Sequence, residues 1–159
     1  MRIVIGADHA GFNLKGPVVE ALKEWGHQVE DVGTHTGERV DFPDVAQAVC
    51  KPILDGKADR GIMVCGTGIG ACMAANKIPG IRAALCHDMY SAHQCVEHDD
   101  ANVLCLGAQI VGDQLAFDLI KTFLAAEFST DPYFRGRLVK LEEMERRAAE
   151  SIRQQAGRG

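Results

Sequence analysis

A cysteine immediately before a glycine-rich loop is the feature of this chain with the clearest chemical potential. Residues 61–77 read GIMVCGTGIGACMAANK. The apolar run that ends at Cys65 predicts a buried strand, and the residues after the loop predict a helix. The loop glycines, Gly66, Gly68 and Gly70, leave backbone N–H groups free to converge on one small anion, and the helix N-terminus adds roughly half a positive charge. The segment therefore indicates a site for chemistry on an anion.

Cys65 lies in the same positive field, which favours the thiolate over the thiol. Helix N-termini and neighbouring cations lower cysteine pKa values from about 8.5 to roughly 3.5–7.5, so we expect a lowered pKa for Cys65. A thiolate that faces an anion-binding loop can act as a base or as a nucleophile. The alternative, an inert core cysteine, stays open because free cysteine is often buried. The remaining cysteines fall within apolar helix or strand patterns and are interpreted as core residues: Cys50, Cys72, Cys86, Cys95 and Cys105.

Acidic and imidazole side chains flank other predicted strands. Asp8 and His9 follow the first strand, and His87 and Asp88 follow the fourth. Because ligands of an open parallel sheet sit beyond the carboxyl ends of its strands, these residues are expected to share one crevice with Cys65. A further group, His98, Asp99 and Asp100, precedes the fifth strand and reaches that crevice only if the end of the preceding helix folds over it.

A thiolate base, an anion hole and nearby carboxylate and imidazole groups are what proton abstraction beside a carbonyl requires. The product of that step is an enediolate, whose new negative charge is placed on oxygen. Preorganised N–H donors stabilise such a charge, and one donor contributes about 10²–10³ in rate. This chemistry needs no redox cofactor and no metal, and the histidine and cysteine spacing does not predict a metal site.

The elements that would position these residues alternate along the chain. Apolar runs predict strands at 3–6, 28–32, 61–65, 81–86 and 102–106, and helical patterns predict helices at 13–25, 43–54, 71–77, 91–97 and 113–128. We expect all five strands to be continuous apolar runs that are covered on both faces, as in a parallel sheet. The order of the elements predicts an α/β fold.

A charged helix is predicted at about 136–155, after a break at Pro132. Its apolar stripe is narrow: Leu138, Leu141, Met144 and Ala148. A stripe of this kind suits either the edge of the domain or the surface of a second subunit. We expect the helix to serve in dimerisation.

Composition limits the class of protein. The chain has 159 residues, a net charge of −5 and 47% hydrophobic residues. This length suits a single domain, which we place at 1–159. The net charge argues against nucleic acid as a partner, and the apolar runs are too short for a membrane-spanning role. The chain lacks a signal-peptide pattern and any C-x-x-C motif, so we expect a cytoplasmic protein.

Longer motifs carry a family resemblance. They are GADHAGF at 6–12, VDFPD at 40–44, CGTGIG at 65–70, ANK at 75–77, GIRA at 80–83 and the pair Glu97-His98. With these motifs spread over almost its whole length, the chain resembles the type B ribose-5-phosphate isomerases and their relatives, the galactose-6-phosphate isomerase subunits. The resemblance implies a Rossmann-like three-layer sandwich. It also implies an aldose–ketose isomerase of a phosphorylated sugar, of the ribose 5-phosphate/ribulose 5-phosphate type, without a cofactor and at a homodimer interface; pairing of dimers stays open.

The resemblance also implies roles for single residues. Cys65 would move the proton between C1 and C2, and Thr67 with the loop amides would stabilise the enediolate. Asp8 and His98 would assist ring opening, and His9 would lie near the sugar phosphate with arginines from the partner chain. The residues expected to bind substrate are His9, Gly66, Gly68, Ile69, Gly70, Asp99, Gln109, Arg135 and Arg137.

The chain departs from the family pattern at the residues expected around the phosphate and the sugar hydroxyls. Asp99 stands where ribose-phosphate members usually have asparagine, and Gln109 stands where they usually have arginine. Of the C-terminal arginine pair, Arg137 matches the second member, Tyr133 occupies the first position, and Arg135 is a candidate substitute. Fewer guanidinium groups weaken a bidentate phosphate clamp. We therefore expect a different sugar phosphate as a real alternative, such as a hexose 6-phosphate or a tetrose phosphate.

Two other interpretations stay open. Gly66-x-Gly68-x-x-Ala71, with Asp88 further on, matches a dinucleotide-binding pattern and would suit a nicotinamide dehydrogenase, although the pattern follows the third strand rather than the first. A non-catalytic sugar-phosphate sensor would explain the departures from the family pattern but not the retained Cys65. A cysteine phosphatase is disfavoured because its signature needs arginine where Ala71 stands.

Overall fold

The computed structural model describes residues 1–156, in which five strands and six helices follow one another in near-perfect alternation. The strands are β1 (Arg2–Ala7), β2 (Gln28–Gly33), β3 (Arg60–Cys65), β4 (Ala83–Leu85) and β5 (Val103–Gly107). The helices are α1 (Phe12–Glu24), α2 (Phe42–Leu54), α3 (Ile69–Ala75), α4 (Met89–Glu97), α5 (Asp113–Ala125) and α6 (Pro132–Ala156). Every strand pair is parallel, in the order β2-β1-β3-β5-β4. The predicted α/β fold is confirmed.

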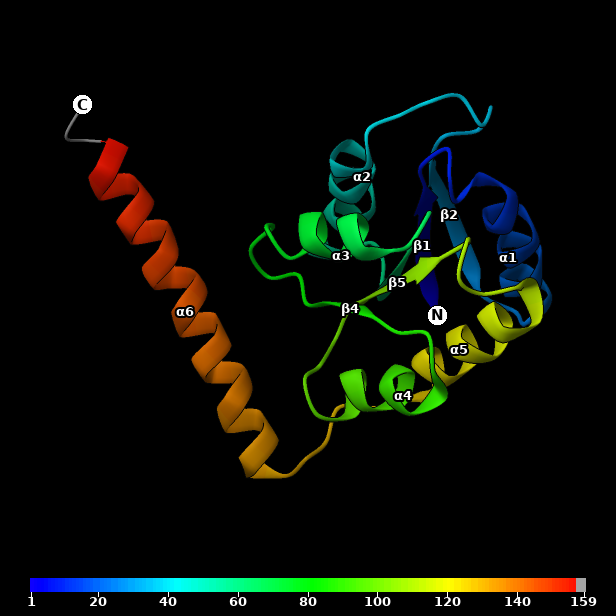
Figure 1. The fold of residues 1–159 in the computed structure, drawn as a ribbon. Helices are drawn as coiled ribbons and strands as arrows, with labels where there is room; N and C mark the ends of the chain where they lie inside the picture. Colours follow the sequence, from blue (N-terminus) through cyan, green and yellow to red (C-terminus); the bar gives the residue numbers. More distant parts are fainter. Residues whose placement is uncertain (157–159) are drawn as a thin grey trace.

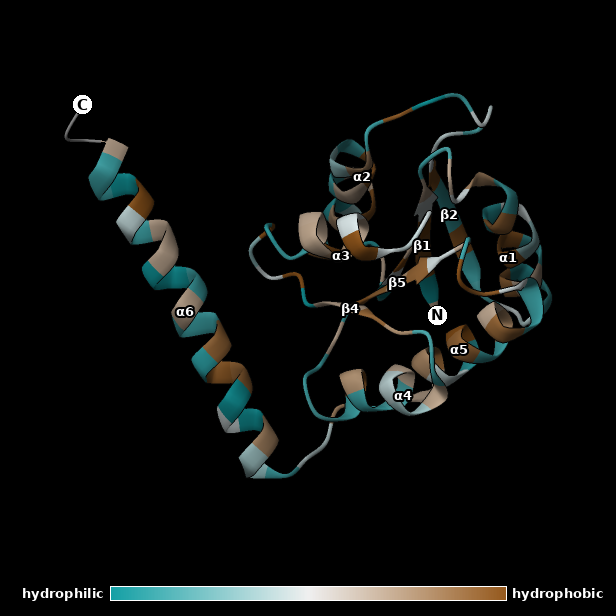
Figure 2. Cartoon of the chain, in the orientation of Figure 1, coloured by the Kyte–Doolittle hydropathy of each residue, from teal (hydrophilic) through white to brown (hydrophobic). Residues whose placement is uncertain are grey.

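The sheet is covered on both faces (Figure 1). Apolar residues of α1, α4 and α5 join one face of the sheet in a single hydrophobic cluster, and residues of α2 and α3 join the other face in a second cluster. The resulting three-layer sandwich is the architecture that the resemblance implied. Figure 2 shows the consequence for hydropathy, with apolar central strands and polar outer surfaces on the covering helices.

The prediction of five fully covered strands is right for the centre of the sheet and wrong for its edges. β1, β3 and β5 are buried along nearly their whole length. β2, with the sequence QVEDVG, alternates between exposed and half-buried residues, and β4 shortens to three half-buried or exposed residues. Each edge strand has a neighbour on one side only, so its outer part faces solvent.

The last helix also starts earlier than predicted, at Pro132 rather than near Gly136, and continues to Ala156. Proline suits the first helical position because its fixed φ is already helical and its missing N–H has no partner there. The carboxylate of Asp131 accepts the backbone N–H of Tyr133 at 2.8 Å, which caps the helix start. The break that the sequence indicated is therefore the N-terminal signal of α6. The helix stands beside the three layers (Figure 1) and buries none of its residues. It contacts the loop before β4, where the Glu145 carboxylate accepts the backbone N–H of Gly80 at 3.1 Å.

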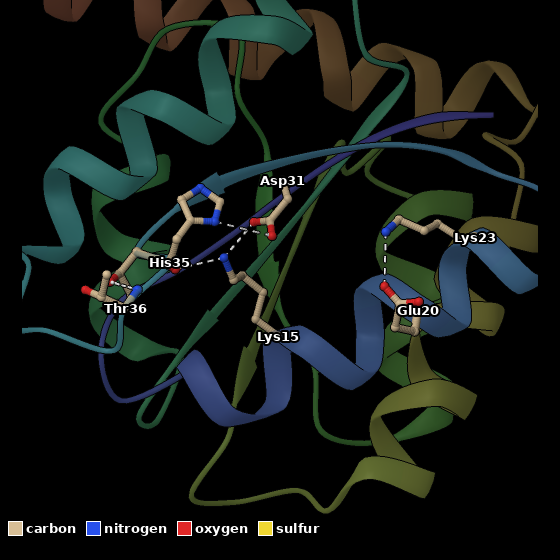
Figure 3. A network of polar contacts seen from close by, with 7 residues as sticks. Lys15, Glu20, Lys23, Asp31, His35 and Thr36 are labelled. Carbon is tan, nitrogen blue, oxygen red and sulfur yellow. Dashed lines mark hydrogen bonds and ion pairs between the residues drawn. The ribbon is translucent and has the colours of Figure 1, made fainter.

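A buried lysine ties α1 to the end of β2. The Lys15 side chain is 3% exposed, and its ammonium donates to Asp31 Oδ1 at 2.6 Å and to the carbonyl of Thr34 at 2.8 Å (Figure 3). His35 Nδ1 lies 3.8 Å from the other oxygen of Asp31. These contacts fix the edge strand to the helix that follows β1.

Candidate active site

The centre of the sheet creates a crevice between the ends of β1 and β3. These strands are neighbours, but α1, which follows β1, covers one face and α3, which follows β3, covers the other. Such a switch point is where open parallel sheets bind ligands. The loop after β1 comes so close to β3 that a side chain on Gly11 would lie 2.3 Å from the carbonyl oxygen of Val64. Glycine at this position therefore lets Asp8 lie beside Cys65.

Cys65 ends β3 at this crevice and is 9% exposed. Burial and the neighbouring Asp8 carboxylate raise the pKa of the Cys65 thiol, whereas the backbone N–H groups of Gly68 and Gly66 lower that pKa. The net direction is upward, so the expectation of a lowered pKa is wrong. The loop amides do act on the sulfur as predicted, but desolvation and a like charge outweigh them.

The Asp8 carboxylate is itself buried and firmly oriented. One of its oxygens, Oδ1, accepts the backbone N–H groups of Ala10 at 2.9 Å and Gly11 at 3.0 Å. The Cys65 thiol lies close enough to this carboxylate for Asp8 to raise the pKa of the thiol. A carboxylate in that place can accept the thiol proton and release a thiolate when a substrate is bound. His9, the next residue, is exposed at the rim of the crevice.

The glycine-rich loop turns sharply through Gly68, whose φ is +78°. A side chain there would lie 3.0 Å from the backbone of Leu106 as well as in a conformation that only glycine adopts easily. This turn leaves Thr67 and Ile69 exposed at the crevice, while Gly66 and Gly68 stay buried and Gly70 is half-buried. The loop thus offers a hydroxyl and several backbone N–H groups to a ligand beside Cys65.

Gln109, which follows β5, and His87, which follows β4, lie next to the glycine-rich loop and the end of β5. Gln109 donates its backbone N–H to the carbonyl of Gly66 at 2.9 Å, and its side-chain amide lies against Gly66. His87 Nε2 accepts the backbone N–H of Gly107, the last residue of β5, at 2.9 Å. This imidazole therefore satisfies the backbone donor at the end of the strand. Asp88 caps α4 by accepting the backbone N–H of Ser91 at 2.8 Å.

His98 lies at the opposite end of the sheet from Cys65. It caps the C-terminus of α4, just before β5, and the first residue of β5 pairs with Gly61 near the start of β3. A strand of this length spans roughly 15–20 Å. The end of α4 therefore does not fold over the crevice of its own chain, and His98 does not reach Cys65.

Aromatic and cationic side chains surround His98 instead. The ring of Phe134 stacks on its imidazole, with centroids 4.0 Å apart and an angle of 13° between the planes. The guanidinium of Arg137 lies 4.6 Å from the centre of the Tyr133 ring and 5.9 Å from that of Phe134. Arg135 lies over a different ring, Phe128, at 5.0 Å.

The site residues predicted from the sequence thus form two groups. The group at the carboxyl end of the sheet contains Asp8, His9, Cys65, Gly66, Thr67, Gly68, Ile69, Gly70 and Gln109. The group at the junction of α4 and α6 contains His98, Asp99, Arg135 and Arg137. Within residues 1–156, no three metal-ligating side chains gather as a metal site would require, and no helix is long and apolar enough to cross a membrane.

Comparison with known proteins decides the family. The model of the family described as Ribose/Galactose Isomerase matches residues 3–141. The chain belongs to this family. It is 46% identical over 129 residues to the D-erythrulose-4-phosphate isomerase of Pectobacterium atrosepticum, covering 80% of this chain and 85% of that protein. It is 43% identical over 127 residues to ribose-5-phosphate isomerase B of Escherichia coli, with the same coverage of 80% and 85%.

Solved structures agree with this family. Ribose-5-phosphate isomerase B of Clostridium thermocellum superposes with a TM-score of 0.90 at 47% identity, covering 93% of this chain and 99% of that one. The type B ribose 5-phosphate isomerase of Leishmania infantum gives a TM-score of 0.89 at 38% identity, with coverage of 92% and 97%. This member of the ribose/galactose isomerase family is accordingly an aldose–ketose isomerase. The interpretation as a nicotinamide dehydrogenase is wrong, and Asp88, the acidic residue of that pattern, caps the start of α4.

Two residues of the site had no functional assignment from the sequence. His87 was expected to share the crevice with Cys65 but was given no role there, and its bond to Gly107 depends on β4 and β5 being neighbours. Phe134 was not noted at all, because the segment before Gly136 was expected to lie outside the helix. Recognising Pro132 as a helix start after the capping Asp131 would have placed Phe134 in the first turn of α6.

Proposed function

We propose that this isomerase interconverts the aldose and ketose forms of a phosphorylated sugar, with Cys65 carrying a proton between C2 and C1. One observation carries the proposal: the Cys65 thiol lies at the switch point of the sheet, between the Asp8 carboxylate and the N–H groups of Gly66 and Gly68. That arrangement supplies a base and an oxyanion site on opposite sides of one small reacting group.

The reaction begins when Asp8 takes the thiol proton and Cys65 becomes a thiolate. The thiolate removes the proton from C2 of an open-chain aldose, the electron pair of that C–H bond forms the C1=C2 double bond, and the π pair of the carbonyl group moves to its oxygen, O1. The Thr67 hydroxyl and the loop N–H groups stabilise the resulting enediolate. Cys65 then returns the proton to C1 while the hydroxyl proton of O2 is transferred to O1. Only protons move between substrate and protein, so the sequence of steps balances without a redox cofactor or a metal.

The raised pKa of Cys65 suits this role once the substrate is bound. Burial and Asp8, which raise the pKa of the thiol, make the corresponding thiolate a stronger base toward carbon. The loop N–H groups, which lower that pKa, are the donors that the enediolate oxygen would share. Charge that leaves the sulfur is thereby taken up by an oxygen close to the same donors.

A second copy of the chain would complete the site. His98, Asp99, Arg135 and Arg137 are too far from Cys65 in their own chain to act on the same sugar. α6 has 25 residues, none of them buried, and leaves four apolar side chains exposed: Val139, Leu141, Met144 and Ile152. Burying an apolar face of this helix against another surface would stabilise it. A homodimer in which α4 and α6 of one copy cover the crevice of the other would bury these residues. It would also bring His98 to the sugar ring and the arginines to the phosphate, opposite His9.

The length of the sugar is the open part of the proposal. Asp99 would contact a hydroxyl group, and Gln109 and Tyr133 leave two arginines fewer around the substrate than the resemblance implied. The relatives named above include isomerases of a pentose phosphate and of a tetrose phosphate. We therefore propose an aldose between four and six carbons, with ribose 5-phosphate as the first candidate and a tetrose 4-phosphate or hexose 6-phosphate as alternatives.

The test is a panel of aldose phosphates of four, five and six carbons, each beside its unphosphorylated sugar, with initial rates measured on the purified protein. We expect turnover of at least one phosphate and of no free sugar. Replacing Cys65 by alanine should reduce that turnover by about 10²–10⁴ or more, because a positioned base is lost. A folded dimer that isomerises none of the phosphates would overturn the proposal.

A further inference from the structure

Four side chains at the start of α6 and the end of α4 form one stacked group. Phe134 covers the face of the His98 imidazole at 4.0 Å, and Tyr133 meets Phe134 edge to face at 5.4 Å. Arg137, one helical turn after Tyr133, lies over the Tyr133 ring at 4.6 Å. We call these residues, His98, Tyr133, Phe134 and Arg137, the aromatic clamp.

In the aromatic clamp, the His98 imidazole and the Arg137 guanidinium are stacked on aromatic rings, and their N–H groups stay free of those rings. The imidazole and the guanidinium both contact aromatic rings through their flat faces. Their N–H groups point outward within those planes, so stacking does not block their hydrogen bonds. Among the described residues, no carboxylate oxygen lies within 4.0 Å of the Arg137 guanidinium. Glu97 Oε2 lies 3.8 Å from His98 Nε2, beyond hydrogen-bond distance. The clamp therefore fixes an imidazole and a guanidinium while their donors and acceptors stay available.

The position of Phe134 is set by the backbone. Asp131 caps the start of α6 and Pro132 opens the helix, which fixes where the first turn lies. Phe134 is half-buried, although α6 has no buried residue, and the neighbouring His98 side chain is 26% exposed. The described residues give His98 no hydrogen bond from its ring, so the stacking contact with Phe134 is what limits the orientation of the imidazole.

We propose that Phe134 is a positioning residue for this reaction: it fixes the plane of His98 and, with Tyr133, holds Arg137 beside it. The end of α4 and the start of α6 thereby present an imidazole and a guanidinium as a prearranged pair to the sugar phosphate bound at Cys65 of a neighbouring copy. The inference rests on the proposed function, in which His98 acts on the sugar ring and Arg137 on the phosphate. Phe134 itself contacts neither the sugar ring nor the phosphate, and it acts through His98 and Arg137.

The test compares Phe134→Leu, which removes the ring, with Phe134→Tyr, which keeps it. Phe128→Leu is the matched control, because Phe128 also lies under an arginine, Arg135, but has no stacking contact with His98. We expect Phe134→Leu to lower kcat/KM on the preferred sugar phosphate by about tenfold or more, the scale expected when a catalytic group loses its orientation. Phe134→Tyr should stay within about twofold of wild type, since the stacked pair is intact. Phe128→Leu, which frees Arg135 but leaves the His98–Phe134 pair intact, should lose clearly less activity than Phe134→Leu and should keep the orientation of His98.

A spectroscopic measurement separates positioning from a merely structural role. The proton NMR resonance of the His98 ring carries the ring-current shift of a stacked aromatic neighbour, and Phe134→Leu should remove that shift while Phe134→Tyr retains it. Sedimentation velocity on each variant reports whether the dimer persists.

Three outcomes would overturn the inference. The first is a Phe134→Leu variant that has lost the ring-current shift but turns over at the wild-type rate. The second is a Phe134→Tyr variant as impaired as Phe134→Leu although it is folded and dimeric. The third is a wild-type protein that isomerises no sugar phosphate, in which case the proposed function fails and the inference falls with it.

Discussion

Mixing two inactive variants gives a quantitative prediction for the composite site. Cys65→Ala removes the proposed base at the carboxyl end of the sheet, and His98→Asn removes the imidazole at the junction of α4 and α6. The two side chains are separated within one chain by about the length of a central strand, roughly 15–20 Å. Each variant alone should therefore be inactive. The two defects lie in different halves of each active site.

The magnitude follows from the symmetry of a homodimer, in which the same two halves meet twice. When equal amounts of the two variants exchange subunits at random, about half of the dimers contain one chain of each kind. Such a heterodimer has one site that carries both defects and one site that carries neither. One of its two sites is thus intact, and the mixture should recover about one quarter of wild-type activity.

The assay is sugar-phosphate turnover after co-refolding or co-expression of the two variants, compared with each variant treated in the same way. A matched control mixes Cys65→Ala with Asp8→Asn, whose defects lie in the same half, so no heterodimer has an intact site. A site formed within one chain would leave the Cys65→Ala and His98→Asn mixture no more active than its components. That result would refute the composite site.

Three further predictions concern single residues. Asp8→Asn removes a charge that raises the pKa of Cys65, so the thiolate fraction near neutral pH should increase and iodoacetamide should alkylate Cys65 at least about threefold faster. Turnover should nevertheless fall, because the group that takes the thiol proton is lost. Site-resolved mass spectrometry that finds no faster alkylation would contradict the effect of Asp8 on Cys65. Asp31→Asn leaves the ammonium of Lys15 buried without its carboxylate, so we expect a loss of about 2 kcal/mol and a melting temperature about 4–8 °C lower by calorimetry. Gly68→Ala forces a side chain into a backbone with φ of +78°, at a cost of about 1–2 kcal/mol. We expect a protein that still folds but has lower turnover, because the loop N–H groups move. Unchanged turnover would show that the loop adapts to the side chain without moving these groups.

Sequence reasoning predicted the centre of the fold because the relevant forces are local in the sequence. The buried strand that ends at Cys65 and the turn through Gly68 are both encoded by neighbouring residues. The same reasoning predicted that Asp8 follows a strand whose end meets this crevice. The edge strands β2 and β4 were misjudged because exposure at a sheet edge depends on which strands are neighbours.

The errors at the site have the same origin. A loop rich in N–H donors favours a thiolate, and that part of the argument for Cys65 holds in the structure. The opposing effects, burial and the carboxylate of Asp8, arise from packing between segments that are far apart in the sequence. The stacking of Phe134 on His98 likewise joins α6 to the end of α4, and no local pattern predicts it.

The central claim is that the sulfur of Cys65 carries the proton, and hydrogen exchange tests it most directly. In D₂O, wild-type protein should introduce solvent deuterium at C1 or C2 of the sugar phosphate at a rate comparable with turnover. Cys65→Ala should lose both turnover and exchange by at least about 10²-fold, while calorimetry finds that it still binds the sugar phosphate. A Cys65→Ala variant that exchanges the carbon-bound proton at the wild-type rate would contradict the claim.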